Sequence, residues 1–361
     1  QSMGNYEAAV KVLLQAMTLS AKLESAKARN QLKFLSNLAL LYQQMGKYAE
    51  AEKIYLELDK KLDKGKPEQA NMLNNYAILS LLMKKEDKVE SMLKQSTGIY
   101  KSSMGESSPA YAKVISDLGN FYRHKARYAE AEPLLQQALQ IREEVLGTNH
   151  PMYVQSQEDL ALLHWKQKDF TTSISLYKTV MEKTLDFINS YFAPMSEAEK
   201  TRYWDMLAPR FQRFYNFALD AASSDKGILK DMFECRTATK GILLSSTRKI
   251  SESISNSGNQ QLIDDYTNWI DHKEQLTKLY AYSKQDLKEQ AVNIDSLEAN
   301  VNSMEKKISK NSKEFADFYF AGKIKFNAIQ NQLKGDEALV EIIRLQQFEQ
   351  GFTDDCRYIG L

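Results

Sequence analysis

The residues that could carry covalent chemistry in this 361-residue chain are few and far apart in the sequence. Only two are cysteines, Cys235 and Cys356. A thiol becomes a nucleophile when a base or a positive charge stabilises its thiolate, but Cys356 directly follows Asp354 and Asp355, which disfavour that anion. Cys235 lies in an expected helix that has no histidine nearby in the sequence. We therefore expect no catalytic residue in this chain.

The spacings that would hold a metal or a cofactor are also missing. The four histidines are scattered, at His124, His150, His164 and His272. The sequence contains no HExxH or CxxC metal spacing, no glycine-rich phosphate loop and no GxSxG nucleophile turn. We expect no cofactor and no metal. An enzyme with an unrecognised site is the least favoured of three alternatives, behind two kinds of binding scaffold.

The composition argues against two classes of partner. Lys and Arg number 48 against 47 Asp and Glu, so a net charge of +1 provides no general attraction to phosphate backbones. No apolar run reaches the roughly 18–20 residues that a membrane-spanning helix requires. Two cysteines far apart in the sequence are typical of a reducing compartment and give no disulfide framework. We therefore expect a cytoplasmic protein that binds neither nucleic acid nor membrane.

A repeated segment indicates which elements dominate the fold. The pentapeptide YAEAE occurs at 48–52 and again at 128–132. Related copies begin at Tyr6, Tyr48, Glu86, Tyr128 and Phe170, with spacings of 42, 38, 42 and 42 residues. Fixed periods of this size are typical of a solenoid in which each unit is a supersecondary element that must stack on its neighbours.

Each unit has a second recurring signature upstream, which predicts a preceding helix. A small residue stands at the same place in four such helices, at Ala39, Ala77, Gly119 and Ala161. Small side chains allow the axes of two packed helices to come close together. The units are therefore predicted to be helix pairs with close internal contacts.

This pattern resembles the tetratricopeptide repeat. The run REEVLG at Arg142–Gly147, followed by His150-Pro151, resembles the 42-residue repeats of kinesin light chains and of many bacterial scaffolds. The resemblance covers roughly residues 1–186, and a generic helical bundle is the alternative. Because the chain begins at what should be the second helix of a unit, we expect more repeats before Gln1 in the native protein.

In such repeats the first helix of each pair lines a concave surface, which predicts a peptide-binding groove. Asparagine can bond a peptide main chain in both directions, and arginine offers a fork for carboxylates. The candidate groove residues are Lys33, Asn71, Asn74, Lys113, Asn120, Arg123, Gln155 and Trp165. A solvated polar face is the alternative for the polar members, and packing against the next unit is the alternative for Trp165.

Residues 187–325 stay helical after the repeat period ends. Aromatic residues between Tyr203 and Phe217 recur at helical spacing and are expected to form core. A heptad pattern follows at Leu287, Ile294, Val301 and Ile308. It predicts an antiparallel helical hairpin over about 261–314.

The last part of the chain, residues 326–361, changes character. The apolar run Ala338–Leu345 predicts a buried strand, Arg357–Leu361 its partner, and Gln350–Asp355 their connection. Two strands alone do not make a stable domain. The predicted fold is therefore all-α, a solenoid followed by a helical hairpin region, ending in a short β-hairpin fragment of a truncated domain.

The order of these pieces resembles bacterial CHAT-domain proteins, in which tetratricopeptide repeats precede a caspase-like peptidase domain. The resemblance is carried by Met195–Lys200 with Tyr203, by Lys240–Leu244, and by Gly335–Glu341 followed by Tyr358-Ile359. It implies a His–Cys dyad located after Leu361. On this reading the chain is the non-catalytic sensor and regulatory segment of such a protease. A stand-alone adaptor scaffold is the second reading.

Overall fold

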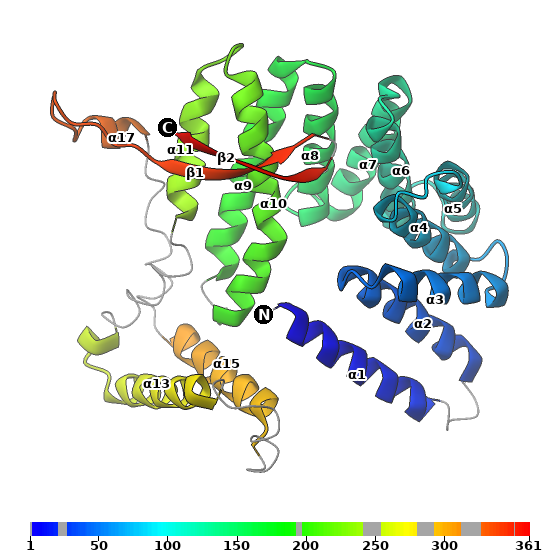
Figure 1. Cartoon of the computed structure of the whole chain (residues 1–361), viewed down its shortest axis with the longest axis horizontal. Helices are drawn as coiled ribbons and strands as arrows, with labels where there is room; N and C mark the ends of the chain where they lie inside the picture. The colour runs from blue at the N-terminus through cyan, green and yellow to red at the C-terminus, as the bar shows by residue number, and fades with distance from the viewer. Residues whose placement is uncertain are drawn as a thin grey trace. The chain divides into compact units, whose positions relative to one another are not determined.

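The computed structural model describes residues 2–20, 27–192, 197–240, 254–279, 292–311, 326–349 and 351–361. These residues are mostly helical, and the chain ends in one antiparallel pair of strands (Figure 1). The predicted fold class is confirmed. The chain divides into two compact units, Gln1–Val180 and Met181–Leu361, and each is described by itself.

The first unit is a succession of helices, each of which packs against the next from α1 to α8. Figure 1 shows them from blue to green. Their bounds are α1 Ser2–Ser20, α2 Lys27–Gln44, α3 Tyr48–Lys61, α4 Pro67–Leu82, α5 Val89–Met104, α6 Pro109–His124, α7 Tyr128–Leu146, α8 Pro151–Lys166 and α9 Phe170–Phe192. Helix α9 continues past the division between the two units.

The turns inside the helix pairs share one backbone conformation. The residue two positions after the end of the first helix has a positive φ in four successive pairs, at Gly46, Lys84, Ala126 and Lys168. Three of these four are not glycine, although the left-handed region disfavours a Cβ atom. The stacked helices therefore impose this turn even where the side chain opposes it.

The connections between pairs use glycine and proline. Gly105 and Gly147 both have a positive φ next to the end of a helix, and the following helices begin with Pro109 and Pro151. Proline suits the first helical position because its missing N–H would have no partner within the helix. A glycine therefore marks the end of one helix pair, and a proline marks the start of the next.

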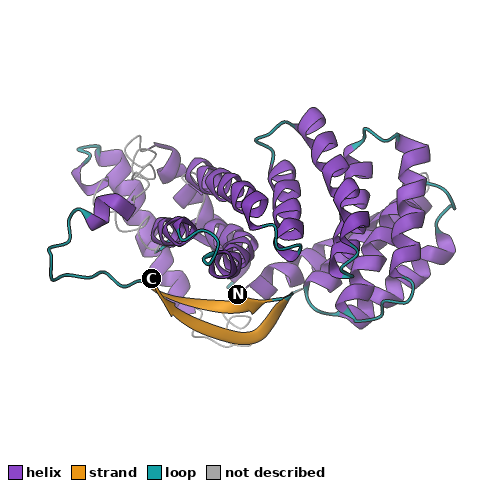
Figure 2. Ribbon diagram, turned by 90° about the horizontal axis from the view of Figure 1, so that it is seen from above, coloured by secondary structure: helices purple, strands orange, loops and turns teal. Residues whose placement is uncertain are grey.

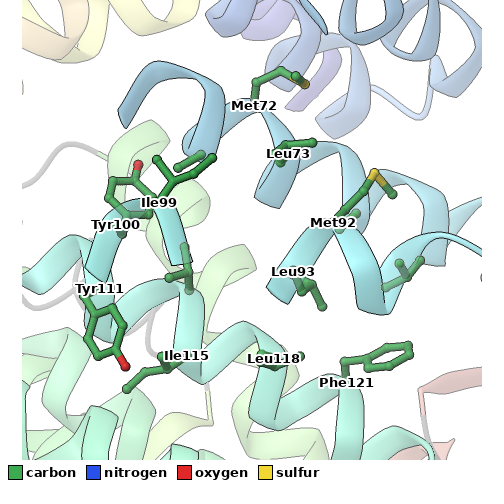
Figure 3. Packing of buried hydrophobic residues seen from close by; sticks show 14 of the residues in the cluster. Met72, Leu73, Met92, Leu93, Ile99, Tyr100, Tyr111, Ile115, Leu118 and Phe121 are labelled. Carbon is green, nitrogen blue, oxygen red and sulfur yellow. The ribbon is translucent and has the colours of Figure 1, made fainter. Parts of the chain in front are cut away.

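The small residues pack as predicted. Ala39, Ala77 and Ala161 are fully buried. A Cβ atom placed on Gly119 of α6 would lie 2.8 Å from Cδ2 of Leu135 in α7. Figure 3 shows the surrounding core, to which Leu73, Leu93, Tyr111, Leu118 and Phe121 contribute from successive helices.

The second unit contains further helices and the hairpin. Its helices are α10 Glu197–Ala221, α11 Gly227–Thr239, α13 Gln260–Leu279, α15 Ile294–Asn311 and α17 Phe326–Gln330. Phe211, Phe214 and Phe217 of α10 are buried, which confirms the predicted aromatic core. None of the helices in the described ranges is long and apolar enough to cross a membrane.

Helices α13 and α15 pack against each other through the predicted apolar positions. Leu262, Trp269 and Leu276 of α13 share a buried cluster with Val301 and Ile308 of α15. Helices α13 and α15 therefore correspond to the two helices of the predicted hairpin. The predicted segments that lie outside the described residues are the first heptad position at 287, the end of the hairpin after 311, positions 195 and 196 of the Met195–Lys200 motif, the 241–244 part of the Lys240–Leu244 motif, and position 350 of the predicted connection.

The two strands form an antiparallel hairpin, β1 Ile342–Phe348 and β2 Phe352–Gly360. Ile343 pairs with Ile359 and Leu345 with Arg357. Ile343 and Leu345 are 1% exposed, and β1 packs on α10. In Figure 2 the hairpin is the orange pair of arrows.

The predicted strand bounds were wrong in both strands. Residues 338–341 are not in a strand, and Val340 is 62% exposed. Strand β1 instead continues into the polar residues Gln346 and Gln347, and β2 begins at Phe352, inside the predicted connection. The apolar run misplaced the strand because the extent of β1 follows its backbone pairing with β2, which runs from Ile342–Gly360 to Phe348–Phe352.

Side chains of α10 also bond the polar end of β1. The backbone N–H of Gln346 donates to Oε1 of Gln212 at 3.1 Å. The Asn216 amide accepts from the N–H of Phe348 at 3.1 Å and donates to the carbonyl of Gln346 at 2.8 Å. Two amide side chains therefore bond the edge of β1 that faces away from β2.

A buried carboxylate adds a charged contact just before β1. Glu341 accepts from Arg236 Nε at 3.0 Å and from Lys240 Nζ at 2.6 Å. Burial opposes its charge, but the hydrogen bonds and charges of Lys240 and Arg236 outweigh burial and lower the pKa of Glu341 below its ordinary value of 4.5. The hairpin is thus held against α11 by an ionised group.

Candidate peptide-binding groove

The candidate groove residues come from the first helix of each pair, α2, α4, α6 and α8. Alignment on the small residues puts Lys33, Asn71, Lys113 and Gln155 at one equivalent position, six residues before each small residue. Asn120 and Arg123 follow the small residue of α6 by one and four positions. The face that these residues share across α4, α6 and α8 is called the inner face below.

Hydrogen bonds cross the inner face from one repeat to the next. Nδ2 of Asn74 donates to Oδ2 of Asp117 at 2.7 Å. One repeat later, Oγ of Ser116 donates to Oδ2 of Asp159 at 3.0 Å. Both bonds join residues 43 positions apart, so the same link is built twice between equivalent positions. It fixes how adjacent first helices stack.

The sequence reasoning missed the two acceptors, Asp117 and Asp159. A signal was present, because both acids occupy one column of the repeat alignment together with Asn37 and Asn75. A polar residue at the same place in four successive helices is unusual for a position beside a core.

The structure brings together two members of the proposed clamp. Nε of Arg123 donates to Oδ1 of Asn120 at 3.2 Å, and both side chains are half-buried. Lys113, the third member, is paired instead with Asp117 at 3.0 Å on its own helix. Asn120 therefore orients the Arg123 guanidinium, while Lys113 neutralises an acid of the cross-repeat links.

Two other candidates are not accessible, contrary to the expectation of a free lining. Asn74 is 0% exposed because its side chain is used in the link to Asp117. Trp165 is 2% exposed, with Nζ of Lys166 4.5 Å from its ring centroid. Burial of Trp165 corresponds to the packing alternative. The indole is a large apolar group whose exposure to water would be unfavourable.

The remaining candidates differ in environment. Lys33 and Asn71 are exposed. Gln155 is half-buried, and its Nε2 donates to Oδ1 of Asp159 at 3.1 Å. Among the eight candidates, the pair of half-buried polar side chains at Asn120 and Arg123 is the best placed to meet a ligand.

Burial shifts the pKa values of two titratable groups near Asn120 and Arg123, namely Asp159 and His124. Burial raises the pKa of Asp159, although the Arg123 charge acts in the opposite direction. Burial and the neighbouring Arg123 lower the pKa of His124, so its imidazole favours the neutral form. Arg123 thus contributes positive charge to this part of the inner face.

The chemistry available here is hydrogen bonding and charge pairing. No group of three or more His, Cys, Asp or Glu side chains suited to a metal ion occurs among the described residues. Both cysteines are free thiols, Cys235 buried and Cys356 half-buried. Neither lies in α2, α4, α6 or α8.

Comparisons with known proteins identify the repeats. Residues 35–68 and 111–183 match models of the tetratricopeptide repeat. The chain thus contains tetratricopeptide repeats, and these are known as modules of protein–protein interaction. No curated protein matches this chain.

One solved structure shares the fold over 68% of this chain, and two others are similar over a shorter part. BtubC (BKLC) from P. vanneervenii is 16% identical, with a TM-score of 0.51 over 68% of this chain and 93% of that chain. Two structures of a putative kinesin light chain from Podosopora anserina, with nearly identical TPR-like repeats, are each 21% identical. They cover 52% of this chain and 90% of theirs, with TM-scores of 0.42 and 0.41.

Proposed function

We propose that the repeats of this chain form a scaffold that binds an extended or helical peptide segment of a protein partner along the inner face. The observation that carries this proposal is the half-buried pair of Asn120 and Arg123. A guanidinium held in one orientation loses less entropy when it binds a carboxylate. The nearby amide adds a group that can bond a peptide main chain.

Exposed leucines add apolar area on α4 and on α2, the first helix of the preceding pair. Leu40 of α2 occupies the position equivalent to Asn120, and Leu82 lies at the end of α4. Leu40 is 38% exposed and Leu82 is 48% exposed. When a ligand covers exposed leucine side chains, removing their apolar surface from water favours binding. The proposed ligand therefore combines apolar side chains with an acidic group that pairs with Arg123.

A displayed library of random peptides tests this proposal even while the natural partner is unidentified. Peptides selected on the whole chain should lose at least about tenfold in affinity for the double variant Asn120→Ala/Arg123→Ala. The matched control is Lys53→Ala/Gln136→Ala, which removes one cation and one amide from exposed positions of α3 and α7. Selected peptides that bind both double variants equally well would place the binding surface elsewhere.

We also propose that this scaffold is the regulatory segment of a CHAT-type caspase-like protease that acts in the cytoplasm. The order of the motifs supports it, as does a hairpin packed directly on α10 by Gln212 and Asn216. A stand-alone adaptor is the alternative. The native reading frame after Leu361, expressed with this chain and treated with a cysteine-reactive electrophile, separates the two. A labelled downstream cysteine with a histidine partner supports the protease, and no labelling supports the adaptor.

A further inference from the structure

The cross-repeat hydrogen bonds of the inner face do not extend to its first helix. The two bonds described above join α4 to α6 and α6 to α8. The residues at the equivalent positions of α2 and α4 are Ser36 and Asn75. Both lie among the described residues, and no hydrogen bond joins their side chains, although α2 and α4 are in contact.

The chemical difference lies in the acceptor position. It is occupied by Asp117 in α6 and Asp159 in α8, but by Asn75 in α4. A carboxylate only accepts hydrogen bonds, so it suits a donor from the protein itself, whereas an amide both donates and accepts. Nδ2 of Asn75 donates to Oδ1 of Asn71 at 3.5 Å, a long and exposed contact. Two amides one turn apart on α4 therefore remain accessible to a ligand.

The side chains around these amides are more exposed than those of the last first helix. Lys33 and Leu40 of α2 are exposed, and Ile78 of α4 is half-buried. At the position of α8 equivalent to Leu40 and Ile78, Leu162 is 4% exposed. Asp159, at the acceptor position of α8, is 5% exposed. The inner face is therefore accessible at α2 and α4 and closed at α8.

We propose that the ligand of the inner face is an extended peptide segment whose main chain bonds the side chains of Asn71 and Asn75; this inference rests on the function proposed above. A helix bonds its own N–H and C=O groups except at its ends, so an extended segment is the ligand that offers a run of unpaired donors and acceptors. Packed helices lie about 8–10 Å apart, which corresponds to about three residues of an extended chain. A ligand whose acid meets Arg123 of α6 therefore crosses α4 about three residues away, with apolar side chains near Ile78 and Leu40.

Peptides selected on the whole chain from the displayed random library separate this inference from the function on which it rests. Asn71→Ala/Asn75→Ala should lower the affinity of the selected peptides about tenfold, because main-chain hydrogen bonds are lost. The matched control Gln95→Ala/Gln136→Ala removes two amides from exposed positions of α5 and α7 and should have no effect.

The outcomes of this experiment are distinct. If the double variant at positions 120 and 123 weakens binding and Asn71→Ala/Asn75→Ala does not, the proposed function stands and the main-chain contact on α4 is overturned. Equal binding to all the variants, or a library from which no peptide is selected, would overturn both.

The substitution Asn75→Asp tests the missing link directly, because it introduces the carboxylate found in α6 and α8. The new carboxylate should accept a hydrogen bond from Ser36 and raise the urea midpoint of the repeats, while the affinity for the selected peptides falls at least about threefold. Ser36→Ala combined with Asn75→Asp should remove the gain in stability. A fall in both stability and affinity in Asn75→Asp would show that the link does not form and would overturn the proposal.

A proline scan of a selected peptide distinguishes an extended ligand from a helical one. Proline breaks the interior of a helix, whereas an extended chain accepts it wherever the N–H group does not contact the protein. Binding that survives proline at some interior positions supports the extended segment. Loss of binding at every interior position would overturn it.

Discussion

The repeat helices of residues 27–166 and the β1–β2 hairpin are stabilised by contacts of different kinds. In the repeats a contact can have an equivalent one unit later, as in the bond from Asn74 to Asp117 and that from Ser116 to Asp159. The contacts that attach the hairpin to α10 and α11 each occur once, and the groups that make them lie more than a hundred residues apart, as with Asn216 and Phe348. Loss of one contact in the repeats therefore leaves equivalent ones in place, whereas loss of one in the hairpin has no substitute.

The largest predicted effect compares a buried leucine in each region. Leu135→Ala in α7 and Leu345→Ala in β1 each empty a site that is 1% exposed, which costs about 3 kcal/mol within a range of roughly 2–5. Leu135→Ala should lower the urea midpoint of the helical repeats. Leu345→Ala should speed amide exchange in β1 and β2 and leave α4–α7 protected as before. Equal loss of protection in both regions after either change would contradict the comparison.

The next effect concerns the charged contact of the hairpin. Glu341→Gln should destabilise the packed hairpin by about 1–2 kcal/mol at neutral pH, discounted because Lys240 is largely exposed. Since the folded pKa of Glu341 is lowered from 4.5, its contribution is complete above pH 4.5 and is lost as the pH falls through the folded value. Amide exchange of β1 measured against pH checks this.

Two features make the Glu341 experiment decisive. The difference between wild type and Glu341→Gln should disappear in acid, because the wild-type carboxyl is then neutral too. Glu349→Gln, an exposed substitution at the end of β1, serves as the control and should have little effect. A pH-independent difference between wild type and Glu341→Gln would show that the contact does not depend on charge.

The smallest effect compares two helical glycines within the repeats. Gly119→Ala should lower the free energy of unfolding of the repeats by about 1 kcal/mol. The clash of the new Cβ atom with Leu135 costs about 1–3 kcal/mol, and the higher helix propensity of alanine offsets up to about 1 kcal/mol of that cost. Gly98→Ala in α5 should stabilise by about 0.5–1 kcal/mol, since a Cβ atom there meets nothing within 4 Å. Urea unfolding of both variants measures the opposite signs. The same sign for both would show that close helix approach at Gly119 is not required.

The sequence was informative where the structure is periodic. The helix pairs and the close approach at Gly119 were predictable because apolar and small residues recur at spacings near 42. The bounds of β1 were not, because they follow its pairing with β2, and the side chains of Gln212 and Asn216 that bond its polar end lie more than 130 residues earlier. Nothing near Gln346 in the sequence indicates that its backbone is already satisfied.

The candidate groove shows the same limit at the level of single residues. Asn120 and Arg123 are three positions apart on one helix, so their contact follows from helix geometry. The burial of Asn74 depends on Asp117 in the next repeat, and a polar residue on the inner face could equally have been solvated. For Trp165 the sequence did not decide between lining the groove and packing in the core, because that choice also depends on the neighbouring repeat.

The cross-repeat bonds of the inner face join only neighbours, because each spans 43 residues and none of those described in this ladder reaches two repeats away. An ancestral gene could therefore duplicate or delete one 42-residue unit and leave every other junction chemically unchanged. Under such a rule, repeat number can drift between descendants while the stacking surface is inherited intact. Divergence in this part of the molecule is then a matter of length as much as of substitution.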